Sequence, residues 1–272
     1  MRKGGPMPEA IDHCALNVAL YGPRRGDGRW TMTERGAGSV QRSSTSLRIG
    51  PSAVRWDGDA LVIEIDEVSA PLPARVRGEV RLYPRSLVRQ SFALDSDGRH
   101  RWHPIAPSAR VEVALTAPDL HWSGEGYFDS NAGERPLEDD FSRWNWSRAA
   151  LANGRSAVLY DVERRDAEPM SLALRFDASG EAEPFEAPSR VALPRTGWRL
   201  QRQTRADIAN DGSEITRVMR TLEDTPFYAR SVLTSQLLGE RATAMHESLS
   251  LDRFTTPACQ WMLPFRMPRN AR

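Results

Sequence analysis

Alternation of apolar and polar residues is the main structural pattern along this chain. Residues 61–68 (LVIEIDEV) and 75–83 (RVRGEVRLY) alternate most regularly, as half-buried strands do. Turn formers such as Asn153-Gly154 separate these runs from others like them. The other predicted strands cover residues 13–20, 30–34, 46–49, 52–56, 100–103, 110–115, 120–129, 156–162, 170–176, 198–206, 214–222, 228–238 and 242–251. With no long 3.6-residue period, the pattern predicts an antiparallel all-β protein.

The arrangement of these runs also indicates how the chain divides. Residues 149–152 and 234–239 are the segments where we expect a helical turn, and nothing longer. The Pro- and Glu-rich stretch 181–194 can be a linker or a long loop. An acidic turn at 138–140 separates two strand-rich halves. We therefore expect an N-terminal β domain at 1–139 and a C-terminal β domain at 140–272.

Charge and hydropathy exclude several classes of function. The chain has 37 Lys and Arg against 36 Asp and Glu, and its arginines are scattered among acids, so no nucleic-acid partner is predicted. The start, MRKGGPMPEA, lacks the apolar segment of a signal peptide. No apolar run approaches the roughly 20 residues of a membrane-spanning helix. We expect a cytoplasmic protein whose membrane contact, if it has any, is peripheral.

Cysteines, histidines and glycines give no metal or cofactor motif. Cys14 and Cys259 lie far apart without metal-ligand spacing, which favours two thiols in a reducing compartment and leaves a disulfide open. Only His100 and His103 are close in sequence, and no HExxH or CxxC pattern accompanies them. A glycine-rich phosphate loop and a GxSxG elbow are also missing. The sequence therefore predicts neither a metal nor a cofactor.

The stretch 120–150 carries the candidate chemistry. Alternate residues of a strand share a face, so Tyr127 and Asp129 point the same way, as do His100 and Trp102. Burial raises a carboxyl pKa and would keep a proton on Asp129 near neutral pH. Asp129 is then a candidate general acid, with Tyr127 or His100 as a relay. Trp102 can place its ring against a developing carbocation.

A tryptophan pair follows in the same stretch, and a purely structural interpretation stays open beside the catalytic one. Trp144 and Trp146 share a face by the same rule and are candidate walls for an apolar substrate. In the structural interpretation, the candidate acid caps a turn at 129–133, the aromatic residues are core, and the histidine is exposed. In either case we expect the carboxylates at 138–140 to be solvated.

At these residues the chain resembles the carotenoid 1,2-hydratase family, also called hydroxyneurosporene synthases. The most specific segment is GYFDSNAGERPLEDDFSRWNWSRA at 126–149. Similar segments run through nearly all of the chain: HCALNVALYG at 13–22, TERG at 33–36, HRWHPIAP at 100–107, LPRTGWRLQR at 193–202, RTLEDTPFYARS at 220–231, HESLSLDRF at 246–254 and MLPFRMPR at 262–269.

The resemblance implies a reaction, a fold and a site. The reaction is the cofactor-free addition of water to the terminal double bond of an acyclic carotenoid such as neurosporene or lycopene, which gives a tertiary alcohol. The fold is two lipocalin-like β domains with the site near their junction. The family's functional residues fall on His100, Trp102, Tyr127 and Asp129. Members carry a further segment before 13–22, so we expect either a start chosen too late or a missing first strand that leaves an edge.

Two other functions stay open. One is a non-catalytic carrier of apolar isoprenoids, because small β-barrels commonly enclose one ligand. The other is the cofactor-free cyclisation of a polyene in a similar pocket. The sequence makes no prediction of the oligomeric state or of the preferred carotenoid.

Overall fold

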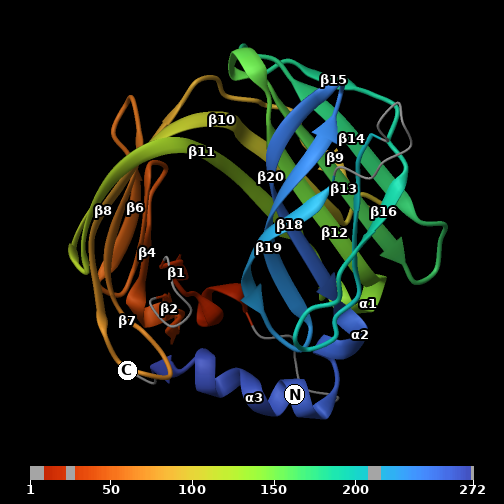
Figure 1. Ribbon diagram of the computed structural model, residues 1–272. Coiled ribbons are helices and arrows are strands. Elements are labelled where there is room, and N and C mark those ends of the chain that lie inside the picture. Colours follow the sequence, from red (N-terminus) through yellow and green to blue (C-terminus); the bar gives the residue numbers. More distant parts are fainter. Residues whose placement is uncertain (1–8, 23–27, 208–215, 271–272) are drawn as a thin grey trace. The chain divides into compact units, whose positions relative to one another are not determined.

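The computed structural model describes residues 9–22, 28–207 and 216–270 (Figure 1). Nearly all of its regular structure is strand, arranged in several antiparallel sheets. The prediction of an all-β protein is confirmed. Within the described residues, no helix combines the length and the apolar character that crossing a membrane would require.

The chain forms two compact units that interleave along the sequence. The first comprises Met1–Pro84, Arg110–Gly126 and Trp261–Arg272, and the second comprises Arg85–Ala109 and Tyr127–Gln260. Three elements supply residues to both units: β10 (His100–Ala117), β11 (Asp119–Gly133) and α3 (Pro257–Arg266). The units therefore do not follow the predicted boundary between 139 and 140, which stays a prediction about independently folding domains.

The first unit is built on a sheet of consecutive strands. One sheet has the order β11-β10-β8-β7-β6-β5-β4, and β9 pairs with β10 off this path. The elements of the first unit are η1 (Ala10–His13), β1 (Val18–Leu20), β2 (Arg29–Thr31), β3 (Glu34–Arg35), η2 (Ala37–Ser39), β4 (Val40–Arg42), β5 (Ser46–Ile49), β6 (Ser52–Trp56), β7 (Leu61–Val68), β8 (Arg75–Pro84) and β21 (Arg269–Asn270).

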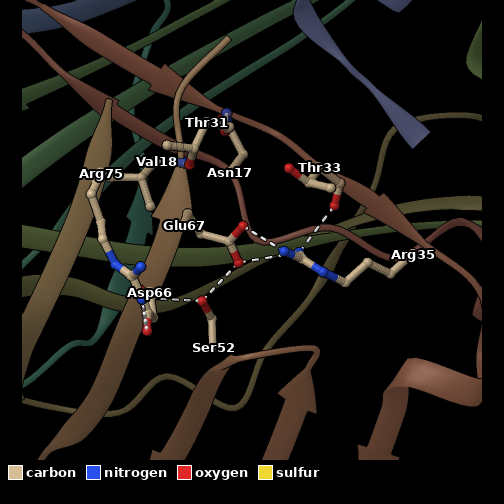
Figure 2. A network of polar contacts seen from close by, with 9 residues as sticks. All are labelled: Asn17, Val18, Thr31, Thr33, Arg35, Ser52, Asp66, Glu67 and Arg75. Atoms are coloured by element: carbon tan, nitrogen blue, oxygen red, sulfur yellow. Dashed lines mark hydrogen bonds and ion pairs between the residues drawn. The ribbon is translucent and has the colours of Figure 1, made fainter. Parts of the chain in front are cut away.

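A buried ion pair lies inside the first unit (Figure 2). Arg35 donates from Nη2 to Glu67 Oε2 at 2.7 Å and from Nη1 to Oε1 at 3.1 Å. Ser52 Oγ donates to Glu67 Oε1 at 2.7 Å, and the Glu67 side chain has no exposed surface. At the preceding position of β7, Asp66 pairs with the exposed Arg75. Glu67 is thus fully compensated by side-chain donors, as a buried carboxylate requires.

The second unit is built on a seven-stranded sheet with the order β15-β14-β13-β12-β20-β19-β18. Figure 1 shows β12, β13, β14 and β20 of this sheet side by side. The elements of the second unit are β9 (Phe92–Ala93), α1 (Leu137–Asp140), β12 (Phe141–Ala150), η3 (Ala152–Gly154), β13 (Ser156–Arg164), β14 (Met170–Phe176), β15 (Ala182–Pro184), β16 (Arg190–Leu193), β17 (Arg202–Arg205), β18 (Arg217–Asp224), β19 (Tyr228–Leu237), β20 (Glu240–Ser250) and α2 (Leu251–Phe254).

Both faces of this sheet are covered, which explains why residues 156–162 of β13 are buried without alternation. An aromatic cluster covers one face and includes Trp102, Phe141, Trp146, Tyr160 and Phe176. An aliphatic cluster covers the other face and includes Ala149, Leu159, Leu193 and Leu233. Consecutive side chains of β12 therefore face two different environments.

Several predicted strands are longer in the structure than the sequence indicates. The runs at 100–103 and 110–115 form one strand, β10, although it contains Pro104 and Pro107. The predicted turn at 129–133 is wrong, because β11 continues to Gly133. Turn formers were outweighed in both places by pairing with neighbouring strands, as context often outweighs strand propensity.

The helical predictions were also incomplete. Both predicted helical turns are misplaced: residues 149–150 belong to β12 and residues 234–237 to β19. A 3-10 turn follows β12 at Ala152–Gly154 and shares only residue 152 with the prediction. The helix α3 was missed, since Pro257 and Pro264 interrupt its pattern and few of its residues are buried. The predicted strand at 214–222 starts outside the described residues, and β18 begins at Arg217. Cys14 and Cys259 are free thiols.

Candidate functional site

Asp129 is the centre of a polar cluster in the second unit. Its Oδ2 accepts a hydrogen bond of 2.8 Å from Trp102 Nε1 and one of 3.0 Å from the Tyr127 hydroxyl. Trp102 comes from β10, where it has no exposed surface, while Tyr127 and Asp129 are alternate residues of β11. The structure therefore joins three of the four residues that the sequence singles out. Asp129 does not cap a turn.

Aromatic rings surround this cluster. The Trp102 ring lies 5.6 Å from Phe92 and 5.7 Å from Tyr160, centroid to centroid. The Tyr127 ring lies 5.3 Å from Trp146. Such distances are typical of packed aromatic pairs. The rings hold the donors of Trp102 and Tyr127 in place, so the position of the Asp129 carboxyl is set by packing as well as by hydrogen bonds.

The cluster opens into a pocket of about 410 Å³, which we call the acid pocket. Its lining residues are Tyr127, Asp129, Asn131, Trp144, Trp146, Tyr160, Arg230, Met245 and Glu247. The two predicted wall residues, Trp144 and Trp146, are both among them. The pocket is not purely apolar, because a second carboxylate, Glu247, faces it and is held by Arg230 Nε at 2.8 Å. It can therefore hold an apolar chain end together with water.

The electrostatics of the pocket favour a proton on Asp129. Burial raises the pKa of the Asp129 carboxyl, and the negative charge of Glu247 raises it further. The hydrogen bonds from Trp102 and Tyr127 oppose this shift without cancelling it. Both of these donors act on Oδ2, so the proton of the neutral acid belongs on Oδ1. Burial and the nearby Asp129 charge also raise the pKa of Tyr127, which keeps its hydroxyl a donor.

His100 has a different place from the one expected. It is 1% exposed, and its Nε2 lies 2.7 Å from Asp140 Oδ2. Its ring packs against Phe141 at 4.9 Å, and it does not line the acid pocket. A Cβ on Gly133 would lie 2.8 Å from His100 Nδ1, so the glycine makes room for the ring. The exposed histidine of the structural interpretation is wrong, and so is the solvated Asp140, whose side chain is 12% exposed.

Sequence reasoning missed five of the lining residues. Tyr160 is buried on β13 and donates from its hydroxyl to Asn131 Oδ1 at 3.3 Å. Glu247 and Met245 alternate on β20, a signal visible in the run 242–251, but nothing in that run says which face meets the tryptophans. Arg230 reaches the pocket because it lies on β19 directly opposite Glu247 of β20. The described residues contain no group of three or more His, Cys, Asp or Glu arranged to hold a metal ion.

Replacing Tyr127 by phenylalanine should raise the pKa of the Asp129 carboxyl further. The lost hydroxyl stabilises the ionised form more than the neutral form. A carbon-13 NMR titration of the carboxyl in both proteins measures the shift, with Asp129→Asn to assign the signal. A lower pKa in the Tyr127→Phe variant would contradict the hydrogen bond.

The raised pKa of Asp129 also makes the stability of the fold depend on pH. The stability that Asp129 contributes is present below its unfolded-state pKa and is lost as pH rises through its folded-state pKa.

The fold and the site together define an all-β, lipocalin-like protein with an aromatic-walled pocket around a carboxylic acid. Among solved structures, the crystal structure of an AttH protein from Nitrosomonas europaea is similar, with a TM-score of 0.57 and 15% identity, covering 86% of this chain and 79% of that one. At this identity the likeness shows the fold alone.

The chain belongs to the carotenoid hydratase CrtC family, whose family model matches residues 3–272. It is 54% identical to an acyclic carotenoid 1,2-hydratase of Thiocapsa roseopersicina over 98% of this chain and 64% of that protein. The same description applies to a Rubrivivax gelatinosus relative at 48% identity, covering 98% and 65%. A Cereibacter sphaeroides relative is 40% identical, covering 96% and 91%. The chain thus spans slightly less than two thirds of the first two relatives.

Proposed function

We propose that this protein adds water to the terminal carbon–carbon double bond of an acyclic carotenoid of the neurosporene or lycopene type. The product is a tertiary alcohol, and the reaction needs water and a proton donor but no cofactor. One observation carries the proposal: Asp129, with its pKa raised by burial, faces a pocket walled by Trp144 and Trp146. Family membership supports the same substrate class.

The first step is proton transfer from Asp129 Oδ1 to the less substituted carbon of the double bond. The π electrons form the new C–H bond, and the positive charge falls on the tertiary carbon, where methyl groups stabilise it. The Asp129 carboxylate that results keeps two donors on Oδ2, from Trp102 and Tyr127. Those donors stabilise the charge that develops on the carboxyl, so they favour the transfer.

In the second step, water adds to the cation. The faces of Trp144 and Trp146 can stabilise the positive charge by cation–π attraction. Arg230 donates to one oxygen of Glu247, Oε1, so Oε2 of this carboxylate is a candidate acceptor for the attacking water. The water oxygen forms the C–O bond, and its extra proton returns to Asp129. One water is added, and the acid is restored.

His100 enters this scheme as a positioning residue. It lies outside the acid pocket and pairs with Asp140 at 2.7 Å. It is two residues from Trp102 on β10, with Phe141 packed on its ring. We propose that the pair with Asp140 fixes this part of β10, and with it the indole that donates to Asp129.

The proposal is tested by incubating the protein with a lycopene-like substrate in water enriched in oxygen-18. Hydration adds the mass of one labelled water to the product. A carrier would retain the polyene unchanged, and a cyclase would give a product of unchanged mass, so either outcome refutes hydration.

Because acyclic carotenoids partition into bilayers, we further propose that the protein works in peripheral contact with the cytoplasmic face of a membrane.

A further inference from the structure

A second pocket, of about 320 Å³, lies in the same unit and has a different chemistry. We call it the arginine pocket. Its lining residues are Arg143, Asn145, Ala192, Leu193, Arg195, Gln201, Arg202 and Gln203. Three are arginines, three carry side-chain amides, and none is acidic. A pocket with three guanidinium groups, further N–H donors from amides and no carboxylate in its lining is suited to an anion.

The arginine pocket lies on the other face of the sheet from the acid pocket. Trp144 and Trp146 of β12 line the acid pocket, while Arg143 and Asn145 line the arginine pocket. The hairpin of β16 and β17 supplies the rest of the lining, with Leu193 paired to Arg202 in its register. The two pockets therefore share a strand but no side chain.

The three guanidinium groups are poorly neutralised. Arg202 is 7% exposed and donates to the Pro194 carbonyl and to the hydroxyls of Thr221 and Ser231, none of which is charged. Burial lowers the pKa of Arg202, and the negative charge of Asp224 opposes this shift only in part. Arg143 reaches Glu163 only at 4.0 Å. Within the described part of the chain, Arg195 has no ion-pair or hydrogen-bond partner.

Two carboxylates lie near this pocket without lining it. Asp161, opposite Asn145 on β13, is held by Arg205 Nε at 2.9 Å. Asp224 accepts from the backbone N–H of Gly197 at 2.7 Å. Neither lines the pocket. The charge of Asp224 acts on Arg202 and offsets part of its positive charge. An anion entering the pocket would therefore meet a net positive charge and would displace no carboxylate from the lining.

The floor of the arginine pocket is oriented by a buried relay. Ser248 Oγ donates to Asn145 Oδ1 at 2.7 Å, so the Asn145 amide is turned with its NH₂ group left for the pocket. Ser248 Oγ in turn lies 3.1 Å from His246 Nε2, which must be the donor because the hydroxyl proton is already used. Burial and the charge of Arg202 lower the pKa of His246 to about 3, so this relay stays neutral at neutral pH.

From this geometry we propose that the arginine pocket is a phosphate-binding site, with Arg195, Arg143 and Arg202 supplying charge and the Asn145 amide a neutral donor. Guanidinium groups bind phosphate oxygens in pairs of parallel hydrogen bonds, which separates this site from a simple surface charge. None of the residues that act in the proposed hydration lines the arginine pocket, so this inference does not depend on that function.

A lipid head group is the source of phosphate that the surroundings favour. Trp198 is 53% exposed on the loop between β16 and β17, in sequence between the two lining residues Arg195 and Gln201. Tryptophan beside basic residues is typical of surfaces that meet the head-group layer of a membrane. A soluble phosphate compound would use the same arginines but would not need the exposed indole.

The test measures binding rather than catalysis. The full chain is titrated calorimetrically with inorganic phosphate and diphosphate at low ionic strength, and sedimented with phosphatidylcholine vesicles with or without phosphatidylglycerol. Arg195→Gln should bind roughly tenfold to a hundredfold more weakly, the range for losing hydrogen bonds to a charged group. Arg175→Gln, an equal charge change on β14 outside the pocket, is the control and should bind like wild type.

The outcomes separate the possibilities. Sedimentation that depends on phosphatidylglycerol and Arg195, and weakens in Trp198→Ala, supports the site and identifies a lipid head group. Arg195-dependent binding of phosphate or diphosphate without vesicle binding supports the site and identifies a soluble phosphate compound. If neither probe binds, or if Arg195→Gln and Arg175→Gln bind equally, the arginine pocket is not a phosphate site. Because Arg195, Trp198 and Arg175 do not line the acid pocket, we expect all three variants to keep hydration activity.

Discussion

Replacing Asp129 by asparagine should lower hydration turnover about 10²–10⁴-fold, the usual contribution of a general acid. Asparagine copies the neutral acid closely: its Oδ1 can accept from Trp102 and Tyr127, and its NH₂ group takes the place of the protonated Oδ1. The pocket should therefore keep its shape and bind substrate with similar affinity. Only the transferable proton is lost. Steady-state product formation and substrate binding, measured separately, distinguish the two effects.

The matched control is Asp139→Asn, the same chemical change at a half-exposed carboxylate of α1 that does not line the acid pocket. It should leave turnover unchanged. In wild type, activity should fall as pH rises through the raised pKa of Asp129, because only the protonated form donates. An Asp129→Asn protein as active as wild type would remove this residue from its role, whatever the protein hydrates.

Replacing Glu67 by glutamine should lower the free energy of unfolding by about 3–5 kcal/mol, the cost of breaking a buried ion pair by removing one partner. The change leaves the Arg35 guanidinium buried without a countercharge, and it turns one acceptor of Arg35 or Ser52 into a donor. Chemical denaturation followed by tryptophan fluorescence measures the loss. The neighbouring Asp66→Asn change, at an exposed pair with Arg75, should cause little loss.

A double variant tests the reason for that loss. Arg35→Met combined with Glu67→Leu removes both charges and replaces them with side chains of similar size. It should recover most of the stability lost in Glu67→Gln, because the single variant suffers mainly from the unpaired charge. If the double variant is as unstable as the single one, packing rather than charge accounts for the effect.

Regular alternation allowed much of the fold to be predicted. The strands β5, β6, β7 and β14 have the predicted bounds, because their apolar residues recur with period two between clear turn signals. The same rule placed Tyr127 with Asp129 and Trp144 with Trp146 on common faces. It required no knowledge of which strands are neighbours.

What could not be predicted depends on contacts between distant segments. His100 and Asp140 are 40 positions apart, on β10 and α1, and no local spacing indicates that they meet. Glu247 reaches the acid pocket because β20 lies beside β12, a neighbour relation that the sequence does not record. The arginine pocket takes its residues from three strands and a loop with no spacing motif. Contacts between distant segments, rather than local pattern, assemble each of these features.

The alternation of β12 has a consequence for how this strand can change in evolution. From Arg143 to Trp146, the odd-numbered residues line the arginine pocket and the even-numbered residues line the acid pocket, so each face of the strand serves one pocket. A single-residue insertion or deletion within β12 would move every side chain beyond it to the opposite face of the sheet. Indoles would then meet the arginines, and a guanidinium would face the carboxylic acid. We expect length changes to be tolerated in the loops beside β12, whereas its own length should stay fixed.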